Sequence, residues 1–234
     1  MKQTMFARLR RWLYRRPLAA MACFGGLYLV LFRLLERAPR PVHLIQCGLD
    51  ARLPFVSGAV LPYVGWFLWV PGVLVYLLVI DRNRFWRGFS AMAGGIVLTL
   101  CLYAVWPTGL ALRGSVPGEG FCSQLVRLIY RMDTPTNVCP SLHVFVTALL
   151  LCALWGRLGW LGRVCNGLAG AAICLSTVLL DQHSVIDVGM GLLLALAMWQ
   201  LSRAGRFARR EKPGRENRPA FSTAGPNRVE NKPG

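Results

Sequence analysis

Residues 55–80 read FVSGAVLPYVGWFLWVPGVLVYLLVI, a stretch without a single charged side chain. A helix of about 20 apolar residues is long enough to cross a hydrocarbon core of roughly 30 Å. The stretch therefore predicts one membrane-spanning helix, with enough length to tilt in the bilayer. Its aromatic residues predict helix packing and a lipid-facing belt rather than a substrate groove: Tyr63, Trp66, Phe67 and Trp69.

Similar apolar stretches occur on both sides of this one, and together they predict six spans. The other five lie at about residues 18–35, 88–106, 139–155, 164–180 and 184–201. The expected fold is an all-α, polytopic membrane helix bundle over residues 18–202. Residues 124–132 predict a short helix at the membrane interface, and residues 81–87 and 157–163 predict short polar loops.

The two ends of the chain differ from this apolar body. Residues 1–17 are basic and predict an amphipathic cytoplasmic segment, with Trp12 and Tyr14 at the interface. Residues 203–234 are rich in Gly, Pro, Arg, Glu and Asn, and such a composition does not bury enough apolar surface to fold. We therefore expect this tail to be disordered.

Charge points to a membrane protein and away from nucleic acid. Only 16% of the 234 residues are charged, against about 25% in a typical soluble domain. The net charge is +17, but 15 of the 27 basic residues lie in the two terminal segments. A nucleic-acid-binding domain gathers its basic residues on one folded face. These segments instead predict topology signals and contacts with anionic lipids.

The distribution of arginine and lysine predicts the orientation. With both termini in the cytoplasm, 20 of the 27 basic residues lie on the inner side, as the positive-inside rule requires. This orientation places residues 36–54, 107–138 and 181–184 outside. Three of the eight cysteines fall in or beside these outer segments: Cys47, Cys122 and Cys139. A disulfide among them stays open, because spacing alone does not assign one.

Two of the three histidines stand at predicted outer ends of spans, His143 and His183. His183 and Asp187 are four residues apart, so on a helix they share one face. A carboxylate on one imidazole nitrogen fixes the tautomer and makes the other nitrogen a better nucleophile. A second histidine can then protonate the leaving oxygen. With external arginines for phosphate oxygens, this set predicts phosphoryl transfer without a metal or cofactor.

The motifs around these histidines resemble those of the type 2 phosphatidic acid phosphatase superfamily. Residues 140–143 are Pro-Ser-Leu-His, and residues 176–187 follow Ser-Thr-x5-His-x3-Asp. The family elements are Pro-Ser-x-His and Ser-Arg-x5-His-x3-Asp. The resemblance extends from about the second span to the sixth. Residues 133–144 are similar to the branch that includes inositol-phosphorylceramide-synthase-like and related bacterial proteins.

The resemblance implies a phosphohistidine mechanism in a bacterial cell membrane, and the predicted orientation places the site at its outer face. His183 would attack phosphorus, Asp187 would orient it, and His143 would protonate the leaving group. Ser141 would hold phosphate oxygens near a helix N-terminus, and Ser176 would contribute to substrate binding. The expected substrate is a phosphomonoester or pyrophosphate of a membrane lipid, with water as the acceptor.

Two departures from the family pattern concern the residues that bind phosphate. Thr177 replaces the arginine of the second motif, and the Lys-x6-Arg-Pro element is absent because lysine occurs only at positions 2, 212 and 232. Arg113 is the expected substitute, followed by Arg127 and Arg131. Asp133 is expected to pair with such an arginine or only with water. His43 is expected to have no role.

Two other functions stay open at this stage. In one, the same intermediate passes a phospho-headgroup to an alcohol acceptor, which would make the protein a lipid phosphotransferase. In the other, the chain is a catalytically silent membrane protein, which the missing lysine and Thr177 would favour. The sequence does not decide which lipid is the substrate or whether the protein forms oligomers.

Overall fold

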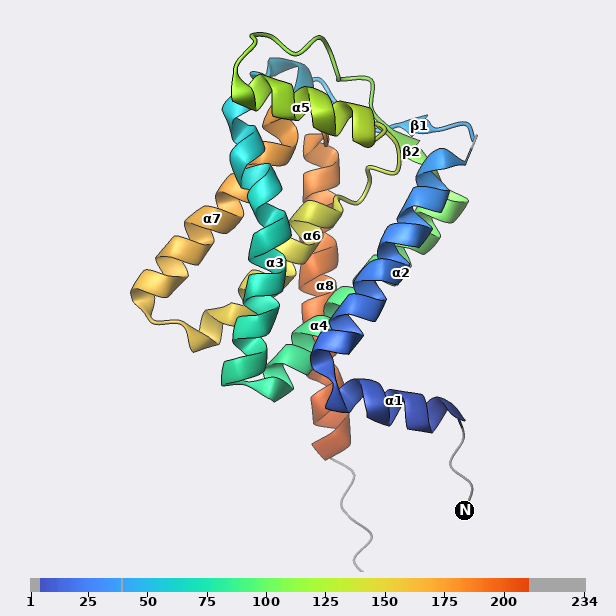
Figure 1. Cartoon of the computed structure of the whole chain (residues 1–234), viewed down its shortest axis with the longest axis vertical. Coiled ribbons are helices and arrows are strands. Elements are labelled where there is room, and N and C mark those ends of the chain that lie inside the picture. The colour runs from blue at the N-terminus through green and yellow to red at the C-terminus, as the bar shows by residue number, and fades with distance from the viewer. Residues whose placement is uncertain (1–4, 39, 211–234) are drawn as a thin grey trace, which may run out of the picture.

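The computed structural model describes residues 5–38 and 40–210, which form a helical bundle (Figure 1). The α-helices in these residues are α1 (Met5–Arg15), α2 (Pro17–Arg37), α3 (Val60–Ile80), α4 (Arg82–Val105), α5 (Phe121–Met132), α6 (Leu142–Leu154), α7 (Trp160–Leu179) and α8 (Val185–Arg210). Three short 3-10 helices are η1 (Asp50–Arg52), η2 (Ser57–Ala59) and η3 (Trp155–Arg157). Two short strands, β1 (His43–Leu44) and β2 (Thr108–Gly109), pair in parallel.

Among the described residues, five helices are long and apolar enough to cross a membrane, which indicates an integral membrane protein. They are α2, α3 with η2, α4, α7, and α8 as far as Ala204. The remaining stretch predicted as a span forms a shorter apolar helix, Leu142–Arg157. This helix is α6 with η3, and α6 packs against α3, α4, α7 and α8 at the centre of the bundle. Its apolar character thus reflects burial by protein on nearly all sides.

Several predicted boundaries are wrong. Residues 82–87, predicted as part of a loop, are the first turns of α4, because the Asp81 side chain accepts a hydrogen bond from Arg84 N (2.9 Å) and caps the helix. Arg163 lies in α7 rather than in a loop. Helix α8 continues to Arg210, so residues 203–210 are helical rather than disordered. Residues 211–234 lie outside the described residues.

The segments predicted to lie outside the membrane gather at one end of the bundle. Strand β1 pairs with β2 through His43–Thr108 and Leu44–Gly109, and α5 lies across the same end (Figure 1). Helix α5 confirms the predicted short helix, although it begins three residues earlier, at Phe121. Helix α1 and the C-terminal end of α8 lie at the opposite end (Figure 1).

Helices α6 and α8 approach each other closely where α8 begins. A Cβ added at Gly191 of α8 would lie 2.8 Å from Ser141 O and 3.2 Å from Phe145 N. Both are backbone atoms, so any larger residue forces the two helices apart. Ser141 N also donates to Asp187 O (3.1 Å) across the same contact. This contact sets the start of α6 against the start of α8, where the two candidate histidines lie.

Candidate functional site

The fold brings His143 and His183 together. His143 is in the first turn of α6, His183 is in the turn between α7 and α8, and their ring centroids are 6.4 Å apart. His183 Nδ1 lies 3.4 Å from Asp187 Oδ2. The spacing that predicted one shared face therefore corresponds to a contact. With Nδ1 directed at the carboxylate, Nε2 of His183 is the ring nitrogen left for a ligand.

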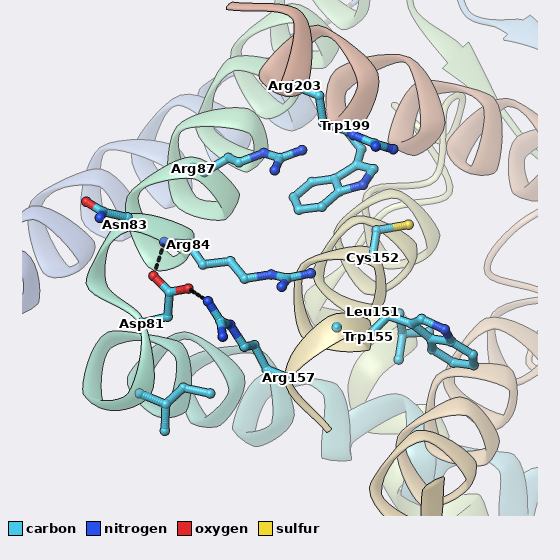
Figure 2. A pocket seen from close by; sticks show the side chains of 12 residues that line it. Asp81, Asn83, Arg84, Arg87, Leu151, Cys152, Trp155, Arg157, Trp199 and Arg203 are labelled. Carbon is cyan, nitrogen blue, oxygen red and sulfur yellow. Dashed lines mark hydrogen bonds and ion pairs between the residues drawn. The ribbon is translucent and has the colours of Figure 1, made fainter. Parts of the chain in front are cut away.

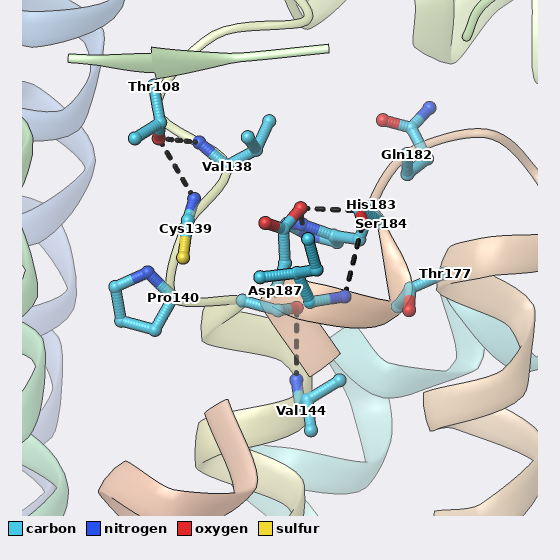
Figure 3. Close-up of polar contacts among 12 residues, drawn as sticks. Thr108, Val138, Cys139, Pro140, Val144, Thr177, Gln182, His183, Ser184 and Asp187 are labelled. Atoms are coloured by element: carbon cyan, nitrogen blue, oxygen red, sulfur yellow. Dashed lines mark hydrogen bonds and ion pairs between the residues drawn. The ribbon is translucent and has the colours of Figure 1, made fainter. Parts of the chain in front are cut away.

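The Asp187 carboxylate is held in place by more than the histidine. Its side chain is fully buried in the first turn of α8, and Oδ2 also accepts a hydrogen bond from Ser184 N (2.9 Å) (Figure 3). The buried thiol of Cys139 lies nearby, and burial together with the Asp187 charge raises the pKa of this thiol to about 12. Cys139 therefore stays protonated at neutral pH beside the carboxylate.

The backbone carbonyl of Thr177 holds the turn that carries His183. Thr177 O accepts hydrogen bonds from Gln182 N (3.0 Å) and His183 N (3.1 Å), and Asp181 adopts a left-handed φ of 49°. The Thr177 hydroxyl donates to Cys174 O, and the Ser176 hydroxyl donates to Ile173 O. Both side chains are buried and neither lines the cavity described below. The Ser176 hydroxyl thus contacts the backbone of its own helix.

Asp50 is a functional candidate that the sequence reasoning missed. Its Oδ1 accepts from Val185 N (2.8 Å), and its Oδ2 accepts from the Ser184 hydroxyl (2.8 Å) and from Cys47 N (2.7 Å). Burial would raise the pKa of Asp50, but these hydrogen bonds outweigh burial and lower it. The ionised carboxylate thus ties η1 to the start of α8. The sequence signal was slight: Asp50 is one of only ten acidic residues and stands just before an apolar span.

The loop before α6 is held by a second set of hydrogen bonds. The Thr108 hydroxyl accepts from Val138 N (3.1 Å) and Cys139 N (3.0 Å) (Figure 3), and the Tyr103 hydroxyl donates to Pro140 O (2.7 Å). Ser141 caps α6 through a long contact from Val144 N (3.5 Å). Ser141 is fully buried and does not line the cavity, so its observed contacts are structural.

Both histidines line a cavity of about 330 Å³ beneath α5. The apolar part of its wall comes largely from aromatic side chains of α2, α3 and α4: Tyr28, Phe32, Tyr63, Trp66, Phe67 and Tyr103. The polar part includes Arg33, Arg113, Asp133, Asn137 and Gln182. The cavity therefore combines a charged end beside the histidines with a broad apolar wall.

The aromatic run of α3 was predicted to serve helix packing and a lipid-facing belt rather than a substrate groove, but three of its four residues surround the His143 ring. Tyr63 stacks on the His143 ring at 4.4 Å between centroids, Trp66 lies at 4.3 Å, and Phe67 lies at 5.9 Å. All three line the cavity, whereas Trp69 Nε1 donates to Asn166 Oδ1 (3.2 Å). The missed signal was the spacing, because residues three and four apart share one helix face.

Arg113 is the predicted arginine that the structure places at the site. Its Nη1 donates to Asp133 O (2.6 Å), and Nη2 contacts Asp133 Oδ2 (3.2 Å) and Gln182 Oε1. The guanidinium carbon also lies 4.7 Å from the centroid of the Tyr130 ring. Asp133 therefore pairs with an arginine rather than only with water. Burial raises the pKa of Asp133 and Glu36 adds to this, while Arg113 opposes both.

The other two predicted arginines lie outside the cavity lining. Arg127 donates to Gly118 O and Val116 O (3.2 Å) and pairs with Glu119, so it holds the loop before α5. Arg131 is exposed at the end of α5. Arg33 lines the cavity instead and pairs with the buried Glu36 (2.7 Å). Sequence reasoning assigned Arg33 no role because it stands within an apolar span.

No disulfide joins the described cysteines, and Cys47, Cys122 and Cys139 are all free. In the described part of the chain, no three or more His, Cys, Asp or Glu side chains are grouped to hold a metal ion. What the site does offer is an imidazole oriented by a carboxylate, a second imidazole and a guanidinium around one cavity. No protein-family model matches the chain, and no similar sequence is found among curated proteins.

Proposed function

We propose that the chain is a membrane enzyme that cleaves a phosphomonoester or pyrophosphate of a lipid through a phosphohistidine on His183. One observation carries the proposal: His143, His183 and Arg113 line the same cavity, with Asp187 against Nδ1 of His183. The motif resemblance to the type 2 phosphatidic acid phosphatase superfamily points to the same chemistry.

In the first step, the lone pair of His183 Nε2 attacks phosphorus and the bond to the leaving oxygen breaks. The leaving oxygen takes a proton from His143, and the phosphoryl group stays on His183. In the second step, water attacks phosphorus and gives a proton to His143, the bond between phosphorus and His183 Nε2 breaks, and phosphate leaves. Arg113 stabilises the charge on the phosphate oxygens in both steps. Both histidines return to their starting state.

The apolar wall of the cavity supports a lipid substrate. Leu29 and Phe32 of α2, Phe67 of α3 and Met132 of α5 line it, and α2 and α3 are both candidate membrane spans. A lipid can lie along such a wall with its phosphate at the histidines. A soluble sugar phosphate would leave this wall in contact with water, at a cost in hydrophobic free energy.

The finer topology belongs to the same proposal. We infer that the short central helix Leu142–Arg157 serves as the sixth span of a type 2 phosphatidic acid phosphatase-like fold. We place both termini in the cytoplasm and the histidine cavity toward the outer face. The concentration of basic residues in the terminal segments supports this orientation.

Threonine in place of an arginine at position 177 favours one second candidate, a lipid phosphotransferase. Without an arginine at position 177, Arg113 and Arg33 are the guanidinium groups that line the described cavity. A phosphodiester carries one negative charge and needs fewer cationic ligands than a phosphomonoester dianion. A transferase would pass the phospho-headgroup held on His183 to an alcohol instead of water.

Phosphate release by the purified protein in mixed micelles tests the proposal. The panel contains phosphatidic acid, phosphatidylglycerophosphate and a polyprenyl pyrophosphate, each with EDTA present. The matched variants are His183→Ala and His43→Ala, because His43 is exposed, lies outside the cavity lining and has its ring tilted against Trp106, with 5.7 Å between the ring centroids.

Release that persists in EDTA, is lost in His183→Ala and survives in His43→Ala is the expected result. A new lipid product that requires an added alcohol such as inositol would establish the transferase. A folded protein that converts none of these lipids, with or without an alcohol, would contradict both functions and leave the silent membrane protein.

A further inference from the structure

The Gln182 side chain is a buried amide in the wall of the histidine cavity, and one end of it has an unused hydrogen-bond donor. Its exposed fraction is 3%, and it lines the cavity together with His143 and His183. Among the residues that the structure describes, none accepts a hydrogen bond from Gln182 Nε2. An amide N–H that is buried without an acceptor costs free energy, so such a group in a folded protein needs an explanation. An acceptor oxygen of a ligand in the cavity provides one.

The contact with Arg113 fixes which end of the amide is free. Arg113 Nη2 donates to Gln182 Oε1, and a guanidinium group has donors only, so the amide oxygen faces Arg113 and the amide nitrogen is the other end. Arg113 is held in turn by Asp133, because Nη1 donates to Asp133 O (2.6 Å) and Nη2 contacts Asp133 Oδ2 (3.2 Å). The Gln182 amide is thus oriented before a ligand arrives, which lowers the entropic cost of binding.

The backbone of Gln182 is held as well as its side chain. Gln182 N donates to Thr177 O (3.0 Å), and the same carbonyl accepts from His183 N (3.1 Å). Gln182 directly precedes His183 in the turn (Figure 3), and His183 Nδ1 lies 3.4 Å from Asp187 Oδ2. One turn therefore brings both an oriented imidazole and an oriented amide to the wall of one cavity.

The unpaired atoms in this wall indicate the chemistry of the ligand. Arg113 Nε is also buried without a partner in the described chain, so two neighbouring side chains each have an N–H donor with no acceptor there. An ionised phosphate offers only acceptor oxygens, which matches such a pair of donors. Two further unpaired atoms lie in the same lining. His143 Nε2 suits the leaving oxygen, and Asn137 Oδ1 suits a hydroxyl or a protonated phosphate oxygen.

We propose that Gln182 is a substrate-binding residue whose Nε2 donates to a nonbridging oxygen of the phosphoryl group that His183 attacks. The inference rests on the proposed function, because that function supplies the phosphoryl group. Arg113 pairs with the Asp133 carboxylate, so part of its positive charge is already balanced. A neutral amide adds a hydrogen bond to the phosphate without adding charge. Gln182 thus provides a ligand that position 177 does not, since the Thr177 hydroxyl donates within its own helix.

Binding of a lipid phosphonate to the full-length protein in a neutral detergent tests this role without requiring turnover. The probe is a short-chain phosphonate analogue of phosphatidic acid, whose P–C bond His183 does not cleave, and isothermal titration calorimetry measures its affinity. Gln182→Met keeps the length of the side chain and removes the donor. Gln124→Met is the matched control, because Gln124 is exposed on α5, lies outside the cavity lining and donates to Glu119 O (2.9 Å).

We expect Gln182→Met to weaken binding about tenfold or more, as the loss of a hydrogen bond to a charged group does. Gln124→Met should stay within about twofold of wild type. A double-mutant cycle separates direct contact from an effect through Arg113. If Gln182 contacts the phosphate, Gln182→Met weakens binding in the Arg113→Met background as well. If Gln182 only holds Arg113, the substitution has no effect in that background, and the proposal is overturned.

Gln182→Glu keeps the test decisive if Gln182→Met is unstable. The glutamate retains an oxygen that accepts from Arg113 and replaces the free donor with a second acceptor oxygen. Binding of the phosphonate at neutral pH should therefore still fall. Binding equal to that of wild type would overturn the proposal.

A separate cavity provides the control for where the probe binds. It is lined by arginines, among them Arg157 and Arg203 (Figure 2), and it shares no lining residue with the histidine cavity. Affinity that is lost in Arg203→Gln but kept in the Gln182 variants would place the probe in that cavity and overturn the proposal. The absence of binding by wild type would overturn it too.

Lipid turnover and phosphonate binding are separate measurements, so the proposed function and the role of Gln182 fail independently. Turnover by wild type, with the same phosphonate affinity in wild type and the Gln182 variants, would remove the role of Gln182 and keep the proposed function. Phosphonate binding that depends on Gln182, without turnover of any lipid phosphate, would keep Gln182 as a phosphate ligand and remove the proposed function.

Discussion

At the scale of single residues, Asp50 joins the segment after α2 to the turn that presents His183. Its carboxylate accepts from Val185 N, Cys47 N and the Ser184 hydroxyl. Asp50→Asn removes the charge and turns one acceptor oxygen into a donor. We expect a loss of about 1–3 kcal/mol in the free energy of unfolding, measured by denaturation in detergent. Glu119→Gln is the control, because Glu119 is largely exposed and should cost little.

The lowered pKa of Asp50 also makes the stability of the folded protein depend on pH. Its folded pKa lies below the usual value of 3.8, so below that pH the unfolded state binds more protons than the folded state. The stability from Asp50 is therefore complete above about pH 3.8 and is lost as the pH falls through the lowered pKa. Below pH 3.8, the melting temperature of Asp50→Asn should fall less steeply than that of wild type. Parallel profiles for the two proteins would show that Asp50 is not the group responsible.

The contribution of Arg113 to kcat/KM should depend on the shape of its guanidinium group as well as on its charge. Its guanidinium reaches Asp133 and Gln182 together, and a lysine ammonium has no such fork. Hydrogen bonds to charged groups contribute about 1.5–3 kcal/mol, so Arg113→Lys should lower kcat/KM by about tenfold or more. Arg127→Lys should leave kcat/KM near wild type, because Arg127 is outside the cavity lining. An Arg113→Lys variant with the kcat/KM of wild type would show that Arg113 acts only through its positive charge.

At the scale of elements, the close contact between α6 and α8 sets the distance between the histidines. Gly191→Ala would bring a Cβ within 2.8 Å of Ser141 O, whereas a Cβ at Gly189 of the same helix meets nothing within 4 Å. We expect Gly191→Ala to cost about 1–3 kcal/mol by overpacking and to lower turnover. Gly189→Ala should be neutral or slightly stabilising, because alanine favours helices. Thermal unfolding of both variants in one detergent checks this, and equal stability would contradict the close approach of the two helices.

The sequence predicted these elements where their signal is local. Long apolar runs identified α2, α3, α4, α7 and α8, and the four-residue spacing placed His183 beside Asp187. The start of α4 was missed because a single cap at Asp81 turns a polar run into helix. The central position of α6 had no local signal, since a lipid-facing helix and a helix buried by protein are equally apolar.

Long-range contacts limited what the sequence predicted of the site. Asp50 reaches Ser184 across most of the chain, and no spacing rule joins two such residues. Arg113 was found because it stands in a predicted outer segment, but Arg33 was hidden inside an apolar span. The aromatic residues around His143 were predicted to pack against helices and to face lipid for a related reason. Their side chains would look the same in the sequence whether they faced lipid or a cavity.

At the scale of the whole molecule, the two ends of the bundle are expected to lie on opposite sides of the membrane. Helix α5, which lines the histidine cavity, lies at one end of the bundle, and the C-terminal part of α8 lies at the other (Figure 1). The proposed orientation puts the first outside and the second inside. Glu119 and Asn83 are both exposed, so a cysteine substituted at each position would report on which side of the membrane that end of the bundle lies.

A membrane-impermeant thiol reagent applied to intact cells checks this orientation. Glu119→Cys should be labelled without permeabilisation, and Asn83→Cys should be labelled only after it, with the labelling of the parent protein subtracted from both. The reverse pattern would place the histidine cavity on the inner face. It would leave the chemistry untouched but would move the substrate to the other leaflet.

The central claim is that His183 carries the phosphoryl group during turnover. The most direct measurement is rapid quenching of the protein after it is mixed with a lipid that carries a radiolabelled phosphate, followed by mapping of the labelled peptide. The account predicts an alkali-stable, acid-labile label on the peptide that contains His183, absent from His183→Ala and present in His43→Ala. Turnover without any label on that peptide, or a label on another residue, would contradict the account.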